Sequence, residues 1–177
     1  MNYYKGIFIN QKNGTYLLDT NYIIHGRGAI WDGGFGDFNK DGFLDILLTN
    51  GDNWDLSRVK KNFHGVRIFM NNGRNQFTQT FFFPLYGTSK ALARDFDDDG
   101  DLDIVAGERY YLNPDWDPIK FRSIEPFGKD YMQDNGDYMH DVDGDGDLDV
   151  IAGQFTLSSV LWFENPGKEG LITEDAW

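Results

Sequence analysis

Residues 95–107 read Asp-Phe-Asp-Asp-Asp-Gly-Asp-Leu-Asp-Ile-Val-Ala-Gly, a cluster of aspartates followed by an apolar run. Aspartates occupy its first, third, fifth and ninth positions, glycine occupies the sixth, and an apolar run follows. The pattern returns at residues 37–48, with Asn39 in the third position, and at residues 141–153. The segments 37–45, 95–103 and 141–149 are called here the first, second and third acidic loops. They hold 14 of the 29 acidic residues of the chain, so its charge excess is concentrated locally.

A second signal recurs between the acidic loops, namely an apolar or aromatic stretch that ends in asparagine. Its instances are Ile7–Asn10, Ile68–Asn71, Tyr110–Asn113 and Trp162–Asn165. Glycine or proline follows each one closely, which is typical of a strand entering a turn. Four such stretches against three acidic loops indicate that the chain begins partway through a unit. We expect repeat units at about 1–24 (partial), 25–84, 85–128 and 129–177 (partial).

The coarse pattern predicts an all-β chain. The runs Asp45–Thr49, Asp103–Ala106 and Asp149–Ala152 are nearly continuous in apolar residues, as expected for strands buried on both faces. Further strands are expected at Tyr16–Leu18, Phe77–Phe83 and Phe121–Ile124. No long segment has helical periodicity. We expect a short helix or a long loop at Asn53–Asn62, and loops at Asn113–Pro118 and Pro126–Asn135.

The acidic loops have the composition of calcium sites. Calcium takes about six to eight oxygen ligands at roughly 2.3–2.6 Å, and carboxylates at alternate positions of a tight turn all point inward. Glycine in the sixth position permits the sharp turn, the seventh residue offers its backbone carbonyl, and the ninth closes the site. The predicted ligands of about three Ca²⁺ ions per chain are Asp37, Asn39, Asp41, Phe43 and Asp45; Asp95, Asp97, Asp99, Asp101 and Asp103; and Asp141, Asp143, Asp145, Asp147 and Asp149.

Two other interpretations compete with this one. Asp and Gly simply favour turns, but three loops with the same spacing are hard to explain by turn preference alone. An EF-hand needs a bidentate Glu in position twelve and flanking helices, whereas that position holds Leu48, Ala106 and Ala152 here. The first acidic loop has one carboxylate fewer than the others, so we predict that it is the weakest site.

Composition narrows the function classes. The net charge of −13 makes nucleic-acid binding improbable, because such a surface repels phosphates. The absence of cysteine excludes disulfides and thiolate metal sites. No run approaches the length of a membrane span, and the first residues do not read as a signal peptide.

The acidic loops and the strands after them match a known pattern. Segments 95–107 and 141–153 resemble FG-GAP/VCBS-type repeats, the blade repeats of integrin-α-like β-propellers, and Trp162–Gly167 looks like that family's strand after the loop. The resemblance covers roughly Tyr4 to Gly167. It implies four-stranded antiparallel blades with the calcium loop between the first two strands, and an extracellular or cell-surface location. Residues 1–177 would then form a single partial propeller of about three to three and a half blades. Propellers usually have about four to eight, so we expect a fragment or a ring completed by a partner chain.

The resemblance implies a non-catalytic module for ligand binding, adhesion or scaffolding, with recognition by loops such as Asn50–Asn62 and Asn113–Asn135. The alternative is a fragment of a polysaccharide-acting lyase or hydrolase, and a third possibility is a purely architectural repeat. The expected partners are a protein or carbohydrate ligand, together with self-association or further blades. His25, His64 and His140 suggest no catalytic pair, and no other catalytic site is predicted. Trp54 and Trp116 are the best candidates for exposed sugar-stacking rings.

Overall fold

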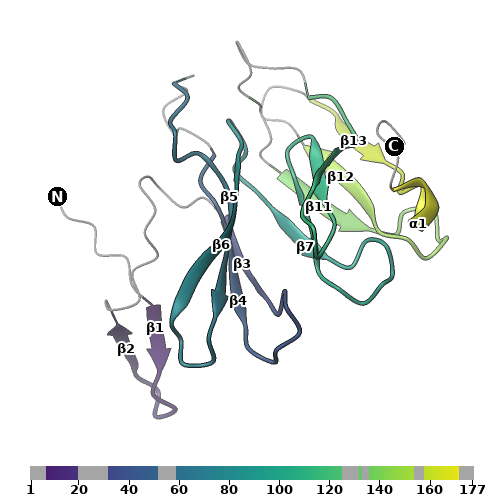
Figure 1. The fold of residues 1–177 in the computed structure, drawn as a ribbon. Coiled ribbons are helices and arrows are strands. Elements are labelled where there is room, and N and C mark those ends of the chain that lie inside the picture. Colours follow the sequence, from purple (N-terminus) through teal and green to yellow (C-terminus); the bar gives the residue numbers. More distant parts are fainter. Residues whose placement is uncertain are drawn as a thin grey trace.

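The computed structural model describes residues 7–19, 32–51, 59–124, 132, 136–153 and 158–171. These residues form an all-β structure of four antiparallel sheets and one short helix (Figure 1). In every sheet, strands that follow one another in the sequence are neighbours in space. Among the described residues the sheets do not close into a barrel or ring.

The first sheet is a two-stranded hairpin, the second and third sheets have four strands each, and the fourth has three. Their strands are β1 (Ile7–Asn10) and β2 (Tyr16–Asp19); β3 (Asp32–Gly36), β4 (Asp45–Thr49), β5 (Gly65–Asn71) and β6 (Phe77–Pro84); β7 (Leu92–Arg94), β8 (Asp103–Ala106), β9 (Arg109–Tyr111) and β10 (Pro118–Lys120); and β11 (Gly136–His140), β12 (Asp149–Gly153) and β13 (Val160–Phe163). Helix α1 (Gly167–Gly170) follows β13. Each sheet falls inside one of the expected repeat units, whose limits remain predictions.

The acidic loops occupy the same place in the three larger sheets. Each one joins the first strand to the second, between β3 and β4, β7 and β8, or β11 and β12. The predicted strands after these loops are confirmed as β4, β8 and β12. The repeated sequence therefore folds into a repeated strand–loop–strand structure.

The core lies between successive sheets. One cluster joins Leu47 and Ile68 of the second sheet to Ile104 and Tyr111 of the third. The other cluster joins their sequence neighbours Val105 and Tyr110 to the fourth sheet. Adjacent residues of a strand point to opposite faces, so the third sheet is buried on both faces. This explains why the runs after the acidic loops are continuously apolar.

Two sheets approach closely at Gly36, the last residue of β3. A Cβ atom added there would lie 2.6 Å from Cδ1 of Leu102 in the second acidic loop. Only glycine leaves room for this contact without a shift of its neighbour. The close approach brings the first and second acidic loops near one another.

The prediction of a strand at Phe121–Ile124 was wrong. The strand is β10, Pro118–Lys120. The loop expected at Asn113–Pro118 therefore ends before Pro118, one residue earlier than predicted. The N–H of Phe121 still donates to the Glu108 carbonyl oxygen. Beyond that point Arg122 turns inward, where its guanidinium donates to the Gly107 carbonyl and to both Asp137 oxygens. This buried link to the fourth sheet takes the chain out of the strand.

The remaining elements were partly predictable. The expected strands Tyr16–Leu18 and Phe77–Phe83 are confirmed within β2 and β6. Residues 52–58 and most of Pro126–Asn135 lie outside the described residues, and so do the predictions made for them. Within the described part of the chain, no helix has the length and apolar character needed to cross a membrane.

Candidate metal centre

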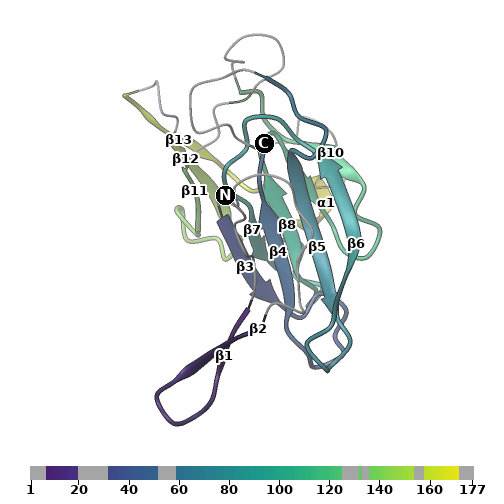
Figure 2. The ribbon, with the colours of Figure 1, turned by 90° about the vertical axis from the view of Figure 1, so that its left-hand side faces the viewer.

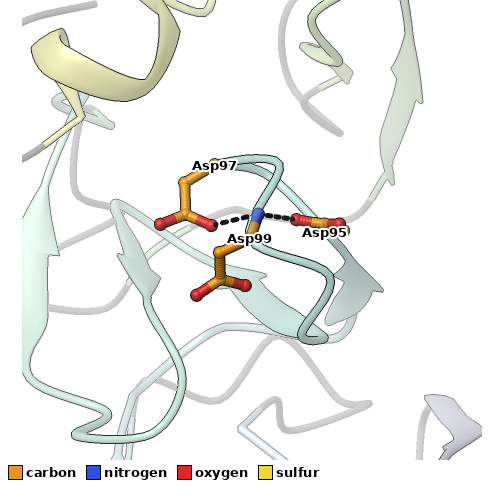
Figure 3. A group of neighbouring side chains, drawn as sticks. All are labelled: Asp95, Asp97 and Asp99. Carbon is orange, nitrogen blue, oxygen red and sulfur yellow. Dashed lines mark hydrogen bonds between the residues drawn. The ribbon is translucent and has the colours of Figure 1, made fainter.

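The second acidic loop is organised by its own carboxylates (Figure 3). Asp95 accepts hydrogen bonds from the backbone N–H groups of Asp99 (3.2 Å) and Gly100 (3.0 Å). Asp97 also accepts from Asp99 N–H (3.3 Å), and the Asp99 carboxylate accepts from Asp101 N–H (2.8 Å). Side-chain bonds of this kind hold the chain in a tight turn. As a result, oxygens of Asp95, Asp97 and Asp99 lie within 4.8 Å of one another and could hold a metal ion.

The third acidic loop repeats this arrangement. Oxygens of Asp141, Asp143 and Asp145 also lie within 4.8 Å of one another. Asp141 accepts from the N–H groups of Gly144 (2.7 Å) and Gly146 (3.2 Å). Gly146, in the sixth position, has φ of 104°, where an L side chain is strained. The glycine in the sixth position is therefore required by the turn.

The first acidic loop has the same backbone bonds but a different charge. Asp37 accepts from Asp41 N–H (3.1 Å) and Gly42 N–H (2.8 Å), as Asp95 does in the second loop. The third position is an amide, and Nδ2 of Asn39 donates to Oδ2 of Asp41 (2.9 Å). One carboxylate oxygen is thus engaged by a neighbouring ligand candidate. In positions one, three and five this loop has two carboxylates, where the others have three.

The aspartates in the ninth position stand apart from these groups. Asp45, Asp103 and Asp149 are almost completely buried. In each, one oxygen accepts the N–H of the second loop residue, at 2.9, 2.9 and 3.0 Å. The other accepts an N–H from the third strand's end, at 2.8 Å in all three sheets. Among the described residues, the structure brings together positions one, three and five but does not include position nine in either group.

The donors at the end of the third strand, or two residues beyond it, are asparagines whose role the sequence did not reveal. They are Asn71, Asn113 and Asn165, which end the stretches noted above. Their side-chain Nδ2 atoms donate to the carbonyl in position eight of the same sheet, at 3.1, 3.3 and 3.2 Å. We call this set of bonds, together with the bond from the asparagine N–H to the aspartate in the ninth position, the Asn–Asp clasp. The clasp fixes each acidic loop to the third strand.

The clasp also reaches the preceding sheet. Nδ2 of Asn113 donates to the carbonyl of Phe38 in the first acidic loop (2.7 Å), and Asn165 does the same to Phe96 in the second (3.4 Å). Lys40 of the first loop forms an ion pair with Asp101 of the second. The first and second acidic loops are therefore in direct contact, and Asn165 links the third clasp to the second loop.

The residues in the seventh position are held in a common orientation. Phe43, Asp101 and Asp147 each donate their backbone N–H to the carboxylate in the fifth position, at 2.9, 2.8 and 2.9 Å. The use of their carbonyl oxygens as metal ligands stays a prediction.

The electrostatics of the loops favour a bound cation. Burial raises the pKa of Asp103 to about 6, and it raises the pKa of Asp45 as well. For Asp97 and Asp147, burial and then neighbouring carboxylates raise the pKa. Each raised pKa means that the surroundings of the carboxyl group disfavour its ionised form. A divalent cation would reverse this, because it stabilises the charged carboxylates.

The other candidates from the sequence do not join the groups of carboxylates, although His140 directly precedes the third loop. His64 is buried with its ring against Phe63 and Tyr86, whereas His140 is exposed at the end of β11. Trp116 is half-buried rather than exposed, because its ring packs against Phe38 and Phe81 beside the core. His25 and Trp54 lie outside the described residues.

Comparison with known proteins adds no further assignment. No protein-family model matches the chain, and no curated protein is significantly similar to it in sequence.

Proposed function

We propose that this chain is a calcium-binding repeat module of the FG-GAP/VCBS type, with its three larger sheets as blades of a β-propeller. About three Ca²⁺ ions would bind, one in each acidic loop. The observation that carries the proposal is the convergence of Asp95, Asp97 and Asp99, repeated by Asp141, Asp143 and Asp145. Hard oxygen donors at such spacing suit calcium better than a softer metal.

The architecture supports the blade interpretation. Antiparallel sheets with an acidic loop between their first two strands follow one another along the chain and share their cores. The metal would stabilise the loops by offsetting repulsion between carboxylates. The remaining loops would then be free to recognise a ligand, and a role in extracellular adhesion, ligand binding or scaffolding follows from the family resemblance.

A calorimetric titration of the metal-stripped protein with Ca²⁺ tests the proposal. We expect a stoichiometry near three, and about tenfold weaker binding at the second loop in Asp97→Asn, because this substitution gives it the amide that the first loop has in the third position. The matched control is Asp98→Asn, which makes the same change one residue away in the fourth position of the loop. That position has a left-handed backbone (φ 55°) that Asn also tolerates. No calcium binding by a protein that circular dichroism shows to be folded would refute the proposal.

A further inference from the structure

The first strands of the three larger sheets lie close together, because β7 contacts both β3 and β11 (Figure 2). Each acidic loop begins where one of these strands ends. The loops of neighbouring sheets are therefore near enough for hydrogen bonds between them. These bonds involve buried groups beneath the exposed carboxylates, and they connect the three candidate sites.

The second residue of the first and second acidic loops is held from two sides. Phe38 N–H donates to Asp45 of its own sheet (2.9 Å), and its carbonyl accepts from Nδ2 of Asn113 in the next sheet (2.7 Å). Phe96 makes the same pair of bonds within its own sheet (2.9 Å) and with Asn165 of the next (3.4 Å). Both peptide groups lie between the candidate ligands in positions one and three. The placement of these ligands therefore depends on the following sheet.

Joined end to end, these bonds form one hydrogen-bond chain from the ninth residue of each acidic loop to that of the next. Asp103 stands at its centre, since one oxygen accepts the Phe96 N–H and the other accepts the Asn113 N–H. All its members except the half-buried Asn113 are at most 3% exposed. A displacement of one member must be matched by its neighbours, because a buried group that loses its partner is costly. In order, the members are Asp45, Phe38, Asn113, Asp103, Phe96, Asn165 and Asp149.

We infer that calcium binding in the second acidic loop raises the calcium affinity of the first through Asn113, and that the third loop acts on the second in the same way through Asn165. This inference rests on the proposed function. A bound ion would hold the second loop and its clasp in one arrangement, which fixes Asn113 and, through it, the Phe38 carbonyl. The first loop then loses less conformational freedom when its own ion binds. The effect is reciprocal by thermodynamic linkage.

Opposing and parallel effects between the loops are weaker. Repulsion between two bound ions works against the coupling, but salt weakens it because positions one, three and five are exposed or half-buried. The ion pair of Lys40 with Asp101 is exposed at its lysine end, so it contributes little. The bond from Asn165 to Phe96 is long for a hydrogen bond. The third and second loops should therefore be coupled more weakly than the second and first.

Nuclear magnetic resonance can follow each loop separately. The backbone N–H groups of Gly42, Gly100 and Gly146 donate to the aspartate in position one of their own loops, so their resonances report calcium binding site by site. The full chain is titrated with Ca²⁺ at about 0.15 M ionic strength. The readout is the calcium concentration at the midpoint of the Gly42 transition.

The test disables the second loop and measures the first. Asp97→Asn combined with Asp99→Asn removes two carboxylates but keeps an acceptor oxygen for each backbone bond. The first loop is predicted to be the weaker site, so in the parent protein it fills when the second loop is already occupied. We expect the Gly42 midpoint to move to at least about fivefold higher Ca²⁺ when the second loop cannot bind.

The matched control removes the same charge near the first loop but outside the acidic loops. Asp115 and Asp117 are exposed on either side of Trp116, whose ring contacts Phe38. Asp115→Asn combined with Asp117→Asn should move the Gly42 midpoint less than about twofold.

Asn113→Ala tests the route of the coupling. In this background, disabling the second loop should change the Gly42 midpoint less than about twofold. Asn71→Ala is the control background. It removes the equivalent bond within the second sheet and two bonds of the following turn, but among the described residues Asn71 bonds to no acidic loop of another sheet. The full shift should remain there. If Asn113→Ala does not fold, Asn165→Ala is tested in the same way, with Asp143→Asn and Asp145→Asn disabling the third loop and Gly100 as the readout.

Two outcomes would overturn the inference and leave the proposed function standing. One is a Gly42 midpoint that does not change when the second loop is disabled, although all three glycine resonances respond to calcium. The other is an equal shift with and without the asparagine, since charge alone would then couple the loops. Failure of all three resonances to respond to calcium would instead refute the proposed function.

Discussion

In the first acidic loop an asparagine amide occupies the third position, whereas the second loop has an aspartate there. The backbone hydrogen bonds are the same in both loops, since Asp37 and Asp95 each accept from the N–H groups of positions five and six. The charge of the loop does change, because Asn39 supplies an amide instead of a third carboxylate. Its Nδ2 donates to Asp41. The comparison separates two tasks within one motif. Positions one, six and nine build the loop, and position three adjusts how strongly it attracts a cation.

Substitution of the aspartate in the ninth position, which both loops share, should give the largest effect, a loss of stability. Asp103→Ala would leave the buried N–H groups of Phe96 and Asn113 without their acceptor, at a cost of about 3 kcal/mol in the free energy of unfolding. Asp45→Ala should cost a similar amount, because Asp45 makes the same two bonds. Urea unfolding in saturating Ca²⁺ measures both.

Asp103→Asn is the control for that measurement, since it keeps one acceptor oxygen and should lose less stability than Asp103→Ala. If Asp45→Ala were nearly neutral while Asp103→Ala was costly, the two loops would not share a structural role for position nine. The similarity of the two loops would then not extend to the ninth position.

Substitution in the third position, where the two loops differ, should give a smaller effect, and this effect should be on calcium affinity. Asn39→Asp replaces the amide by a third carboxylate, as in the second loop. We expect Ca²⁺ to bind the first loop about tenfold more tightly, because affinity rises with ligand charge. The same substitution should slightly destabilise the metal-free protein through repulsion with Asp37 and Asp41.

Calorimetry on Asn39→Asp and on Asn72→Asp separates the site from the overall charge. Asn72 lies in the exposed β5–β6 turn, so its substitution adds the same charge outside the acidic loops. Equal affinities for Asn39→Asp and the parent protein would show that the third position does not set the order of the sites.

Local pattern predicted the loops and the strands after them because both depend on nearby residues. Turn chemistry fixes residues 95–103, and an apolar run such as Asp103–Ala106 suits a strand covered on both faces. The Phe121–Ile124 strand failed because Arg122 is drawn into an ion pair with Asp137 in another sheet. No local pattern carries that information.

The asparagine clasp was missed for a similar reason. Asn113 was visible as the end of an apolar stretch, but its partners Asp103 and Phe38 are 10 and 75 residues away. The spacing of the acidic loop also suggested that position nine points at the metal. Its burial and its two backbone donors show that it is a structural tie as well.

The contact between the two loops should give the smallest effect. The ammonium of Lys40 lies against Asp101, and a hydrogen bond to that carboxylate raises the lysine pKa. A positive charge beside the second loop opposes the arrival of a cation. Lys40→Gln should therefore raise the calcium affinity of the second loop by about twofold at low salt, and the gain should vanish near 1 M salt because the charge is exposed. Lys120→Gln, on β10, removes the same charge from elsewhere on the chain and should leave that affinity unchanged. A fall in calcium affinity on Lys40→Gln would mean that the ion pair orders the second loop for binding. The ordering of the second loop by Lys40 would then outweigh the repulsion between the ammonium and the cation.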